Sequence, residues 1–273
     1  MPDAESSALS AFAAELRSWR KRADWTQVVL GDKIGYSDSF ISDIERCART
    51  PPLDLATACD REFGTPGTFE RLRERVSKEA YSPWFSPFVH MESAACRIHS
   101  WDARFFTGLL QTPGYAHSIV RAAHPEWPAE RVEHDVSARM DRQKIFERGA
   151  DEDQRPPSCW YVIGETAFHS TFGSTDVMRD QIDHITHLSY EPWITVQVYP
   201  FAVPDCPGSD GPVTVFDFAD KPSEGYAEGY EAGRVIQAPA DVARLTAMFD
   251  HLRASALSPR DSATWIAAYR REL

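Results

Sequence analysis

The sequence has no closely spaced cysteines and no long apolar run. Its five cysteines are an odd number, lie far apart and form no C-x-x-C pair, which argues against a disulfide framework and a zinc cluster. The longest apolar runs, such as WYVI and WITVQV, are much shorter than the roughly 20 residues of a membrane-spanning helix. The N-terminal segment MPDAESSALS lacks the basic and apolar regions of a signal peptide. We therefore expect free thiols and a cytoplasmic protein.

The sequence also lacks the motifs of common catalytic and nucleotide sites. It contains no G-x-S-x-G, no G-x-x-x-x-G-K-[ST] and no G-x-G-x-x-G pattern. The best remaining candidate is DHITH, where His184 and His187 lie three residues apart on a predicted helix, close to Asp180 and Asp183. No third metal ligand follows from the spacing, and two histidines on a helix are usually ordinary surface residues. We predict no catalytic residue, no metal and no cofactor, and a protein that is not an enzyme.

Positive charge is scarce as well. The formal net charge is −12, with 29 Lys and Arg against 41 Asp and Glu. This balance argues against a nucleic-acid coat protein or a membrane-surface binder, because both depend on excess positive charge. Residues 1–80 hold 12 basic and 14 acidic residues, a net of −2, so −10 falls on the rest of the chain. An acidic C-terminal region suits a basic partner protein and discourages non-specific contact with DNA.

What the sequence does have is enough apolar surface for a substantial core. It is 273 residues long with 42% hydrophobic and 12% aromatic residues, a length that fits one or two domains. Helical spacing predicts five helices in the first 80 residues. Beyond them, periodicity predicts strands such as SCWYVIG, WITVQVYP and PVTVFDF, a weaker strand candidate in YEAGRVIQ, and helices that include one over 129–148. We predict a multi-domain chain, with an all-α bundle over 1–78 and a mixed α/β domain over 79–273.

The stretch TQVVLGDKIGYSDSFISDIERCARTP has the spacing of a helix-turn-helix. Thr26 is a suitable N-cap for the first helix, Gly35 ends it, and Ser37 caps the second helix. A small helical bundle with no nucleic-acid role would show the same periodicity. The charge raises a second question, because Ser37–Glu45 contains no lysine or arginine and yet carries three carboxylates. These are Asp38, Asp43 and Glu45.

The same residues resemble the Cro- and repressor-like helix-turn-helix family, also called the xenobiotic-response-element family. Its pattern is T-Q-x-x-L-A, then a glycine and S-x-x-x-S-x-I-E-x-G-x-R-x-P, and the resemblance covers residues 9–65. The chain departs from it at Asp24 and Cys47, where glycine is usual, and at Gly31, where alanine is usual. Cys47 is the more unexpected change, because a helix end with positive φ favours glycine. The matching residues are Thr26, Gln27, Leu30, Gly35, Ser42, Ile44, Glu45, Arg49 and Pro51.

By position, the resemblance implies that residues at the two helix starts contact phosphates and that the outward face of the second helix contacts bases. Gln27 and Ser37 occupy the helix starts, where backbone N–H groups favour phosphate oxygens. On the outward face, serine pairs with several base edges, aspartate accepts from cytosine N4, and an aromatic ring touches the thymine methyl. The predicted DNA-binding residues are Gln27, Ser37, Asp38, Ser39, Phe40, Ser42, Asp43 and Arg49.

Positive charge for this interface has to come from outside the second helix. For each candidate cation taken singly, a place on an ordinary solvated surface is as good an explanation as a contact with DNA. A duplex site suits a homodimer, because half-sites about 10 base pairs apart match a two-fold axis. The candidate cations are Arg17, Arg20, Lys21, Arg22, Lys33, Arg46 and Arg49.

The C-terminal region resembles, through motifs in a consistent order, the C-terminal domain of actinobacterial helix-turn-helix regulators described as antitoxin-like or Scr-type. The motifs are SWDARFFTGLLQTPGYA, ARMDRQKIF, VIGETAF, WITVQVYP and PVTVFDF. The resemblance implies a transcription factor that is often paired with a small protein encoded at the adjacent locus. It makes Gln111, Arg139, Arg142 and Glu165 candidate contacts for a partner or ligand. The alternative is structural, with GLLQT as a buried turn and Arg142 paired with Glu165.

These observations predict a sequence-specific transcriptional regulator, a repressor, that binds a double-stranded DNA operator as a homodimer. Its C-terminal domain would respond to the small partner protein or to a small-molecule effector, and we expect the protein to be associated with the nucleoid and not with a membrane. The alternative is an antitoxin-like protein that mainly binds and neutralises a small partner, with only autoregulatory DNA binding.

Overall fold

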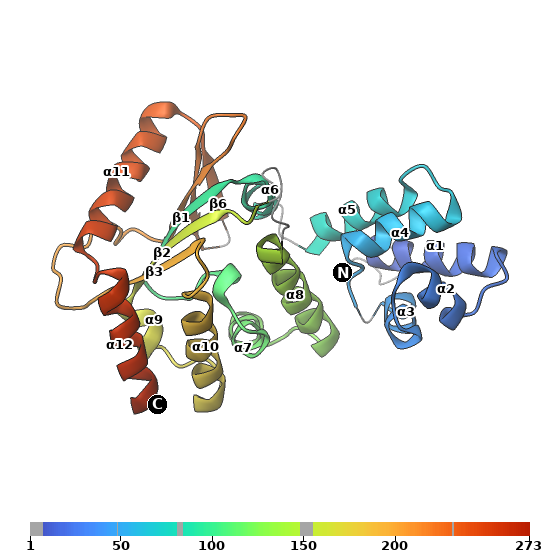
Figure 1. Cartoon of the computed structure of the whole chain (residues 1–273), viewed down its shortest axis with the longest axis horizontal. Helices are drawn as coiled ribbons and strands as arrows, with labels where there is room; N and C mark the ends of the chain where they lie inside the picture. Colours follow the sequence, from blue (N-terminus) through green and yellow to red (C-terminus); the bar gives the residue numbers. More distant parts are fainter. Residues whose placement is uncertain (1–7, 48, 81–83, 148–154, 231) are drawn as a thin grey trace. The chain divides into compact units, whose positions relative to one another are not determined.

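The computed structural model describes residues 8–47, 49–80, 84–147, 155–230 and 232–273. The chain divides into two compact units, one of residues 1–83 with 126–141 and the other of residues 84–125 with 142–273. The first unit is helical, and the second combines helices with a sheet (Figure 1). This arrangement confirms the predicted fold class. The boundary that the sequence predicts between residues 78 and 79 stays a prediction, and it falls within the last turn of a helix.

The helical unit is a bundle around one apolar core. Phe12 and Phe69 meet edge to face with ring centroids 5.5 Å apart, and Leu16, Leu30 and Ile44 are fully buried beside them. The five helices predicted in the first 80 residues are confirmed. They are α1 (Ala8–Arg22), α2 (Gln27–Ile34), α3 (Asp38–Glu45), α4 (Leu53–Phe63) and α5 (Thr68–Ala80). Residues 129–141 of α8 (Ala129–Arg142) group with this unit.

Local capping fixes the turn between α2 and α3. Thr26 Oγ1 accepts from the Val29 N–H at 3.2 Å, and Ser37 Oγ accepts from the Phe40 N–H at 3.1 Å, so both predicted N-caps are confirmed. Gly35 ends α2 in the left-handed conformation with φ of 79°. A Cβ added to Gly31 would lie 2.3 Å from the Tyr36 carbonyl oxygen. The alanine usual at this position therefore has no room in the turn as this chain forms it.

Cys47 sits at the end of α3 with φ of 61°, a conformation that L side chains rarely adopt. We expect Cys47→Gly to stabilise the helical unit by about 0.5–1 kcal/mol, because glycine removes the steric strain of this conformation but loses more chain entropy on folding. Thermal unfolding of the full chain would measure the change. Cys47→Ala is the matched control, since it removes the thiol and keeps the Cβ, and an equal gain in that variant would contradict the explanation.

The second unit is built on a six-stranded mixed sheet in the order β3-β2-β1-β4-β5-β6. The first three strands run parallel to one another, and β4, β5 and β6 are antiparallel to their neighbours. The strands are β1 (Arg97–Asp102), β2 (Ser158–Gly164), β3 (Ile194–Tyr199), β4 (Val213–Asp217), β5 (Glu224–Gly229) and β6 (Ala232–Ile236).

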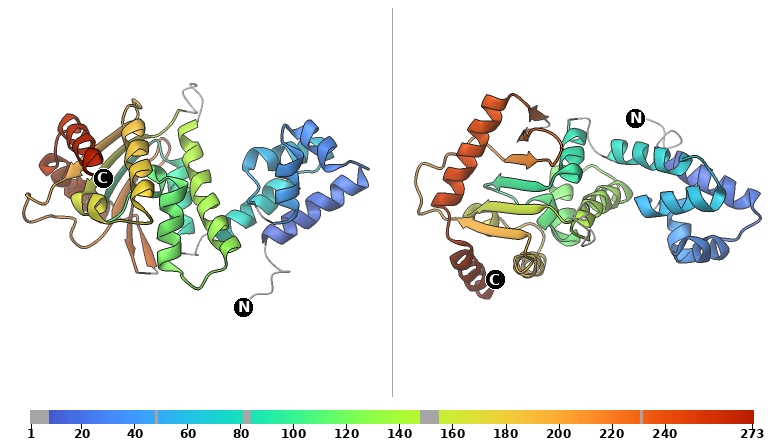
Figure 2. Two further views of the ribbon diagram at one scale, coloured as in Figure 1. Left: turned by 90° about the horizontal axis from the view of Figure 1, so that it is seen from below. Right: turned by 45° about the horizontal axis from the view of Figure 1, so that its top comes forward.

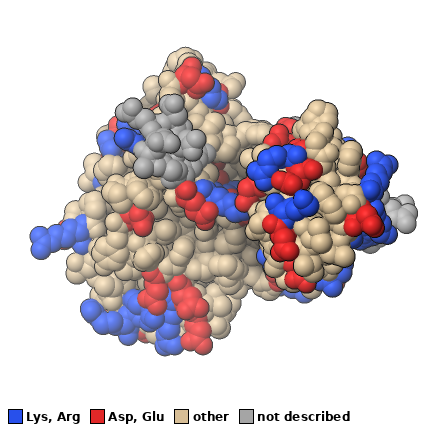
Figure 3. Space-filling model, turned by 45° about the vertical axis from the view of Figure 1, so that its right-hand side comes forward, with Lys and Arg blue, Asp and Glu red and all other residues tan. Residues whose placement is uncertain are grey.

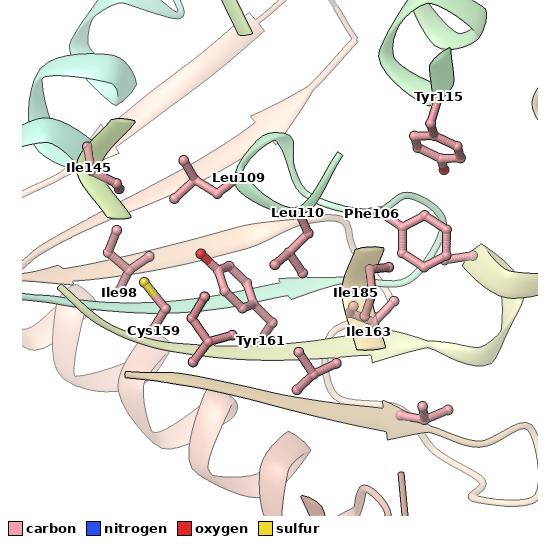
Figure 4. Close-up of a cluster of buried hydrophobic side chains, with 14 of the residues drawn as sticks. Ile98, Phe106, Leu109, Leu110, Tyr115, Ile145, Cys159, Tyr161, Ile163 and Ile185 are labelled. Atoms are coloured by element: carbon pink, nitrogen blue, oxygen red, sulfur yellow. The ribbon is translucent and has the colours of Figure 1, made fainter. Parts of the chain in front are cut away.

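Helices cover both faces of this sheet (Figure 1 and Figure 2). Strand β2 shows why, because alternate side chains point to opposite faces. Tyr161 and Ile163 enter the large core drawn in Figure 4, whereas Val162 packs with Phe249 of α11 on the other face. The helices of this unit are α6 (Ser86–Ala94), η2 (Gly108–Leu110), α7 (Pro113–Ala123), η3 (Gln143–Glu147), α9 (Glu165–His169), α10 (Thr175–Leu188), α11 (Pro239–Ser255) and α12 (Pro259–Glu272). Every helix in the described residues is too short or too polar to cross a lipid bilayer.

The secondary structure differs from the sequence prediction in two places. The helix predicted over 129–148 ends at Arg142 and gives way to a 3-10 turn, in which Gln143 Nε2 donates to the Gly108 and Gln111 carbonyls at 3.0 and 2.6 Å. Residue 148 lies outside the described residues. Strand β5, with the sequence EGYAEG, was missed because glycine and glutamate are depleted in strands. Pairing on both sides and burial of Tyr226, 1% exposed, hold it in the sheet.

Candidate nucleic-acid interface

The carboxylate of Glu45 lies inside the helical unit and not on its surface. Its side chain is 3% exposed and forms a bidentate ion pair with Arg20. The Nε–Oε1 distance is 2.6 Å and the Nη2–Oε2 distance is 2.9 Å. Gln27 Nε2 donates to Oε2 at 2.9 Å, and Arg17 Nη2 donates to the Glu45 carbonyl at 2.5 Å. Burial alone would raise the pKa of Glu45, but these hydrogen bonds and nearby charges hold it below its ordinary value. This carboxylate is therefore ionised and neutralised within the fold.

The second carboxylate, Asp43, is partly neutralised at the surface. Arg46 Nη2 lies 2.7 Å from Asp43 Oδ1, and Arg49 Nη2 lies 3.9 Å from Oδ2. Both arginines are exposed, at 66% and 49% of their side chains, whereas Asp43 is 29% exposed. Asp43 thus keeps two exposed guanidinium groups beside α3, and its own negative charge is the less exposed part of this cluster.

The exposed end of α3 is its N-terminus. Ser37, Asp38 and Ser39 are all exposed, and the Ser37 and Ser39 hydroxyls lie 2.9 Å apart. Asp38 stands in the first turn of the helix, where the N-terminal dipole stabilises a negative charge. Of the three carboxylates that raised the charge question, this one alone is exposed and has no ion pair in the described structure.

Phe40 lies differently from its predicted outward position. Its ring is half-buried against the helical core, 4.8 Å from the Tyr36 ring, and the Arg49 guanidinium lies 4.7 Å above it. An apolar ring on an eight-residue helix is buried in preference to the polar side chains around it. Ser42 is half-buried as well. Contact of these residues with bases stays a prediction.

The cations proposed from the sequence fall into two groups. Arg20 is used internally, with 13% of its side chain exposed and a further bond from Nη1 to the Trp25 carbonyl at 2.9 Å. The other six have exposed side chains, namely Arg17, Lys21, Arg22, Lys33, Arg46 and Arg49. Basic and acidic side chains alternate over the helical unit, at the right in Figure 3. The face in view is therefore of mixed charge.

Acid should destabilise the helix-turn-helix through Glu45. Because the folded pKa of Glu45 lies below the ordinary value of about 4.3, its stabilising contribution is complete above that value and is lost as the pH falls through the lowered folded pKa. Hydrogen exchange of α1–α3 between pH 7 and 3 would measure the loss. Glu45→Gln is expected to be less stable at neutral pH but to lose this part of the pH dependence, so equal slopes in the two proteins would contradict the assignment.

Two of the four predicted partner-binding residues are buried in the α/β unit. Gln111 is 3% exposed and donates from Nε2 to the Phe106 carbonyl at 2.7 Å. Arg142 is 7% exposed and binds the Glu92 carboxylate with Nε–Oε1 at 2.7 Å and Nη2–Oε2 at 2.8 Å. The Arg142–Glu165 pair considered from the sequence is therefore wrong, because Glu92 takes that place. GLLQT is a buried turn, as the structural alternative held.

The other two candidates have accessible surface. Arg139 is 29% exposed and pairs with Asp135 at 3.3 Å. Glu165, 16% exposed, accepts from the Phe201 N–H at 2.7 Å and lies 3.4 Å from His169 Nε2. These two remain predicted partner contacts.

Both units match known protein families. A model described as a helix-turn-helix domain matches residues 11–75, the part of the chain that contains most of α1, all of α2–α4 and most of α5. A second model, described as a domain of unknown function, DUF5753, matches residues 85–268. The chain belongs to the DUF5753 family. No curated protein and no solved structure matches it. The helix-turn-helix match makes this DUF5753 protein a DNA-binding regulator of transcription.

The histidine pair of this DUF5753 protein does not form a recognisable metal centre. His184 is half-buried. Its pKa is lowered mainly by burial and also by the charge of the neighbouring His187. Asp183 is turned to Arg270, with Oδ1–Nε and Oδ2–Nη2 both at 2.7 Å. Within the described residues no three His, Cys, Asp or Glu side chains gather as metal ligands.

Sequence reasoning missed the structural role of Arg20 with Glu45. Arg20 was placed among the groove cations and Glu45 among the repelling carboxylates. The two are 25 residues apart in sequence, and no local spacing rule joins them. Only the packing of α1 against α3 brings them together.

Proposed function

We propose that this DUF5753 protein is a sequence-specific transcriptional repressor that binds its operator as a homodimer through α2 and α3. The observation that supports this best is that two of the three carboxylates of α3 are paired with arginines. Glu45 is neutralised internally by Arg20, and Asp43 is flanked by Arg46 and Arg49. A helix with this arrangement meets a polyanion with far less repulsion than its sequence suggests.

The exposed end of α3 supplies the groups for direct readout in this proposal. Asp38 and Ser39 would reach base edges, where the carboxylate accepts from amino groups and the hydroxyl pairs with either kind of group. Ser37 and Gln27, at the two helix starts, would contact phosphates of the DNA backbone and so position the protein on the duplex. Arg49 would also contact a phosphate. Phe40, Ser42 and Asp43 complete the proposed surface.

The C-terminal unit would control DNA binding through a small partner protein or a ligand. Glu165 is the proposed contact in this unit, since its side chain has accessible surface, and Arg139, which groups with the helical unit, is a separate proposed contact. The protein would act by binding and not by catalysis. The antitoxin-like alternative is less well supported, because the charge arrangement of α3 supports DNA reading as a function in itself.

Selection of full-length protein against random duplex DNA at a stated low salt concentration tests the proposal. We expect one enriched sequence with two half-sites about 10 base pairs apart, or a multiple of that spacing. Ser39→Ala should weaken binding to that sequence by about ten-fold, as a lost base contact costs about 1–3 kcal/mol. It should leave non-specific binding unchanged.

Ser255→Ala, an exposed serine at the end of α11, is the matched control and should leave DNA affinity unchanged. The proposal fails if the full-length protein prefers no sequence over random competitor.

A further inference from the structure

The α/β unit contains a cavity of about 490 Å³ beside α11. This volume lies within the range of about 300–1,000 Å³ typical of small-molecule sites. One wall is a single face of the helix, with residues recurring every three or four positions. They are Pro239, Val242, Ala243, Thr246, Ala247 and Asp250. The opposite wall comes from the end of β4, the turn into β5 and the residue that follows β6. Its residues are Asp217, Pro222, Ser223 and Gln237.

The polar side chains of this cavity offer mainly acceptors. Ser223 Oγ donates to Asp217 Oδ1 at 2.6 Å, and Gln237 Nε2 donates to Glu224 Oε1 at 3.1 Å. The Thr246 hydroxyl donates to a carbonyl of its own helix at 3.0 Å. The donors of both hydroxyls are therefore used within the protein, and the Gln237 amide keeps one N–H. The other free positions are lone pairs of hydroxyl, amide and carboxylate oxygens, so the cavity favours a ligand that brings donors.

Two carboxylates strengthen this preference. Asp217 pairs with Arg97 at 3.3 Å, and Asp250 pairs with Arg253 at 2.9 Å. The two arginine side chains are exposed, at 56% and 37%, and the described lining of the cavity contains no lysine or arginine. Exposed pairs of this kind are worth about 0–1 kcal/mol, so a cation in the cavity competes with them easily.

The rest of the lining is apolar and mostly open to the surface. Val242 is 7% exposed, and Ala243, Ala247, Pro222 and Pro239 present only small hydrophobic groups. From these observations we propose that the cavity binds a small organic cation, a protonated amine or guanidine on an apolar body. Binding depends on the cavity alone, whereas its use as an effector site rests on the proposed function.

Calorimetric titration of the full-length protein at pH 7 tests the proposal with three matched probes. These are 2-phenylethylammonium, the neutral 2-phenylethanol and the anionic 3-phenylpropanoate. We expect saturable binding of the ammonium probe, at least about ten-fold tighter than the alcohol, a difference equivalent to about 1.4 kcal/mol, and no binding of the carboxylate. Equal affinity for ammonium and alcohol, or saturation by the carboxylate, would overturn it.

Variants locate the site. Ala247→Trp fills the cavity from α11 and should abolish binding, whereas Ala254→Trp places the same ring on an exposed position of the same helix outside the lining and should not. Asp250→Asn should weaken the ammonium probe and leave the alcohol unchanged. Binding that survives Ala247→Trp would overturn the assignment.

A fourth titrant distinguishes a small-molecule cation from a lysine side chain of a partner protein. Nα-acetyl-lysine amide should bind more weakly than 2-phenylethylammonium, and equal or tighter binding would assign the site to a partner protein and overturn the small-molecule proposal. Operator affinity measured with and without the ammonium probe tests the proposed function separately, since the probe can bind whether or not an operator is found.

Discussion

Replacement of Arg20 by alanine is expected to destabilise the helix-turn-helix by about 3–5 kcal/mol, because it leaves a buried carboxylate without its counter-ion. Glu45 is 3% exposed and keeps only Gln27 and the more distant Arg17 as partners after this change. The loss is a large part of the about 5–15 kcal/mol that stabilises a typical domain. We therefore expect DNA binding to disappear together with the fold of α1–α3.

Hydrogen exchange of the full-length variant would measure this effect segment by segment. Amides of α1–α3 should exchange much faster than in the parent, while those of β1–β3 should not change. Arg17→Ala is the control, because its side chain is 47% exposed and lies 3.7 Å from the same carboxylate. It removes an exposed ion pair and the hydrogen bond to the Glu45 carbonyl, so we expect a cost of about 1–2 kcal/mol, well below that of Arg20→Ala. Normal protection of α1–α3 in Arg20→Ala would show that the ion pair does not hold this unit together.

Arg142→Ala should have a comparable effect on the α/β unit. The substitution leaves the Glu92 carboxylate, whose side chain is 4% exposed, without its counter-ion. The free energy of unfolding should again fall by about 3–5 kcal/mol. It also removes the guanidinium that lies 5.2 and 5.4 Å from the Phe85 and Phe88 rings. Denaturant unfolding followed by fluorescence would report the loss of stability.

Two further variants decide whether Arg142 is structural. Arg142→Met with Glu92→Met replaces the pair by apolar groups and should recover most of the stability, since such replacements are often neutral. Arg139→Ala removes an i,i+4 pair worth about 0.3–0.5 kcal/mol. It should destabilise the chain far less than Arg142→Ala while weakening the binding of any partner that contacts Arg139. If Arg142→Ala were as stable as the parent, a role in the fold would be excluded.

The helices and caps of the first unit followed from local rules. Thr26, Gly35 and Ser37 mark the turn because each acts on backbone groups within a few residues, where side-chain identity is enough to decide. Apolar spacing placed Leu30, together with Ile44, in the core for the same reason. The main strands of the second unit followed from alternation.

Where the sequence misled, the interaction joined distant parts of the chain. Arg142 was matched with Glu165, but Glu92 lies beside it in the folded unit. Strand β5 has poor strand-forming residues and exists because β4 and β6 pair with it. The cavity beside α11 is likewise formed by segments that no sequence pattern brings together.

By itself the sequence determined most of the helices and strands, the helix-turn-helix and the class of protein, since these depend on periodicity and on contacts within a few residues. Only the tertiary structure decided which charges remain exposed. Burial and pairing depend on which elements pack together, and that packing turned Glu45 from a surface carboxylate into an internal ligand of Arg20.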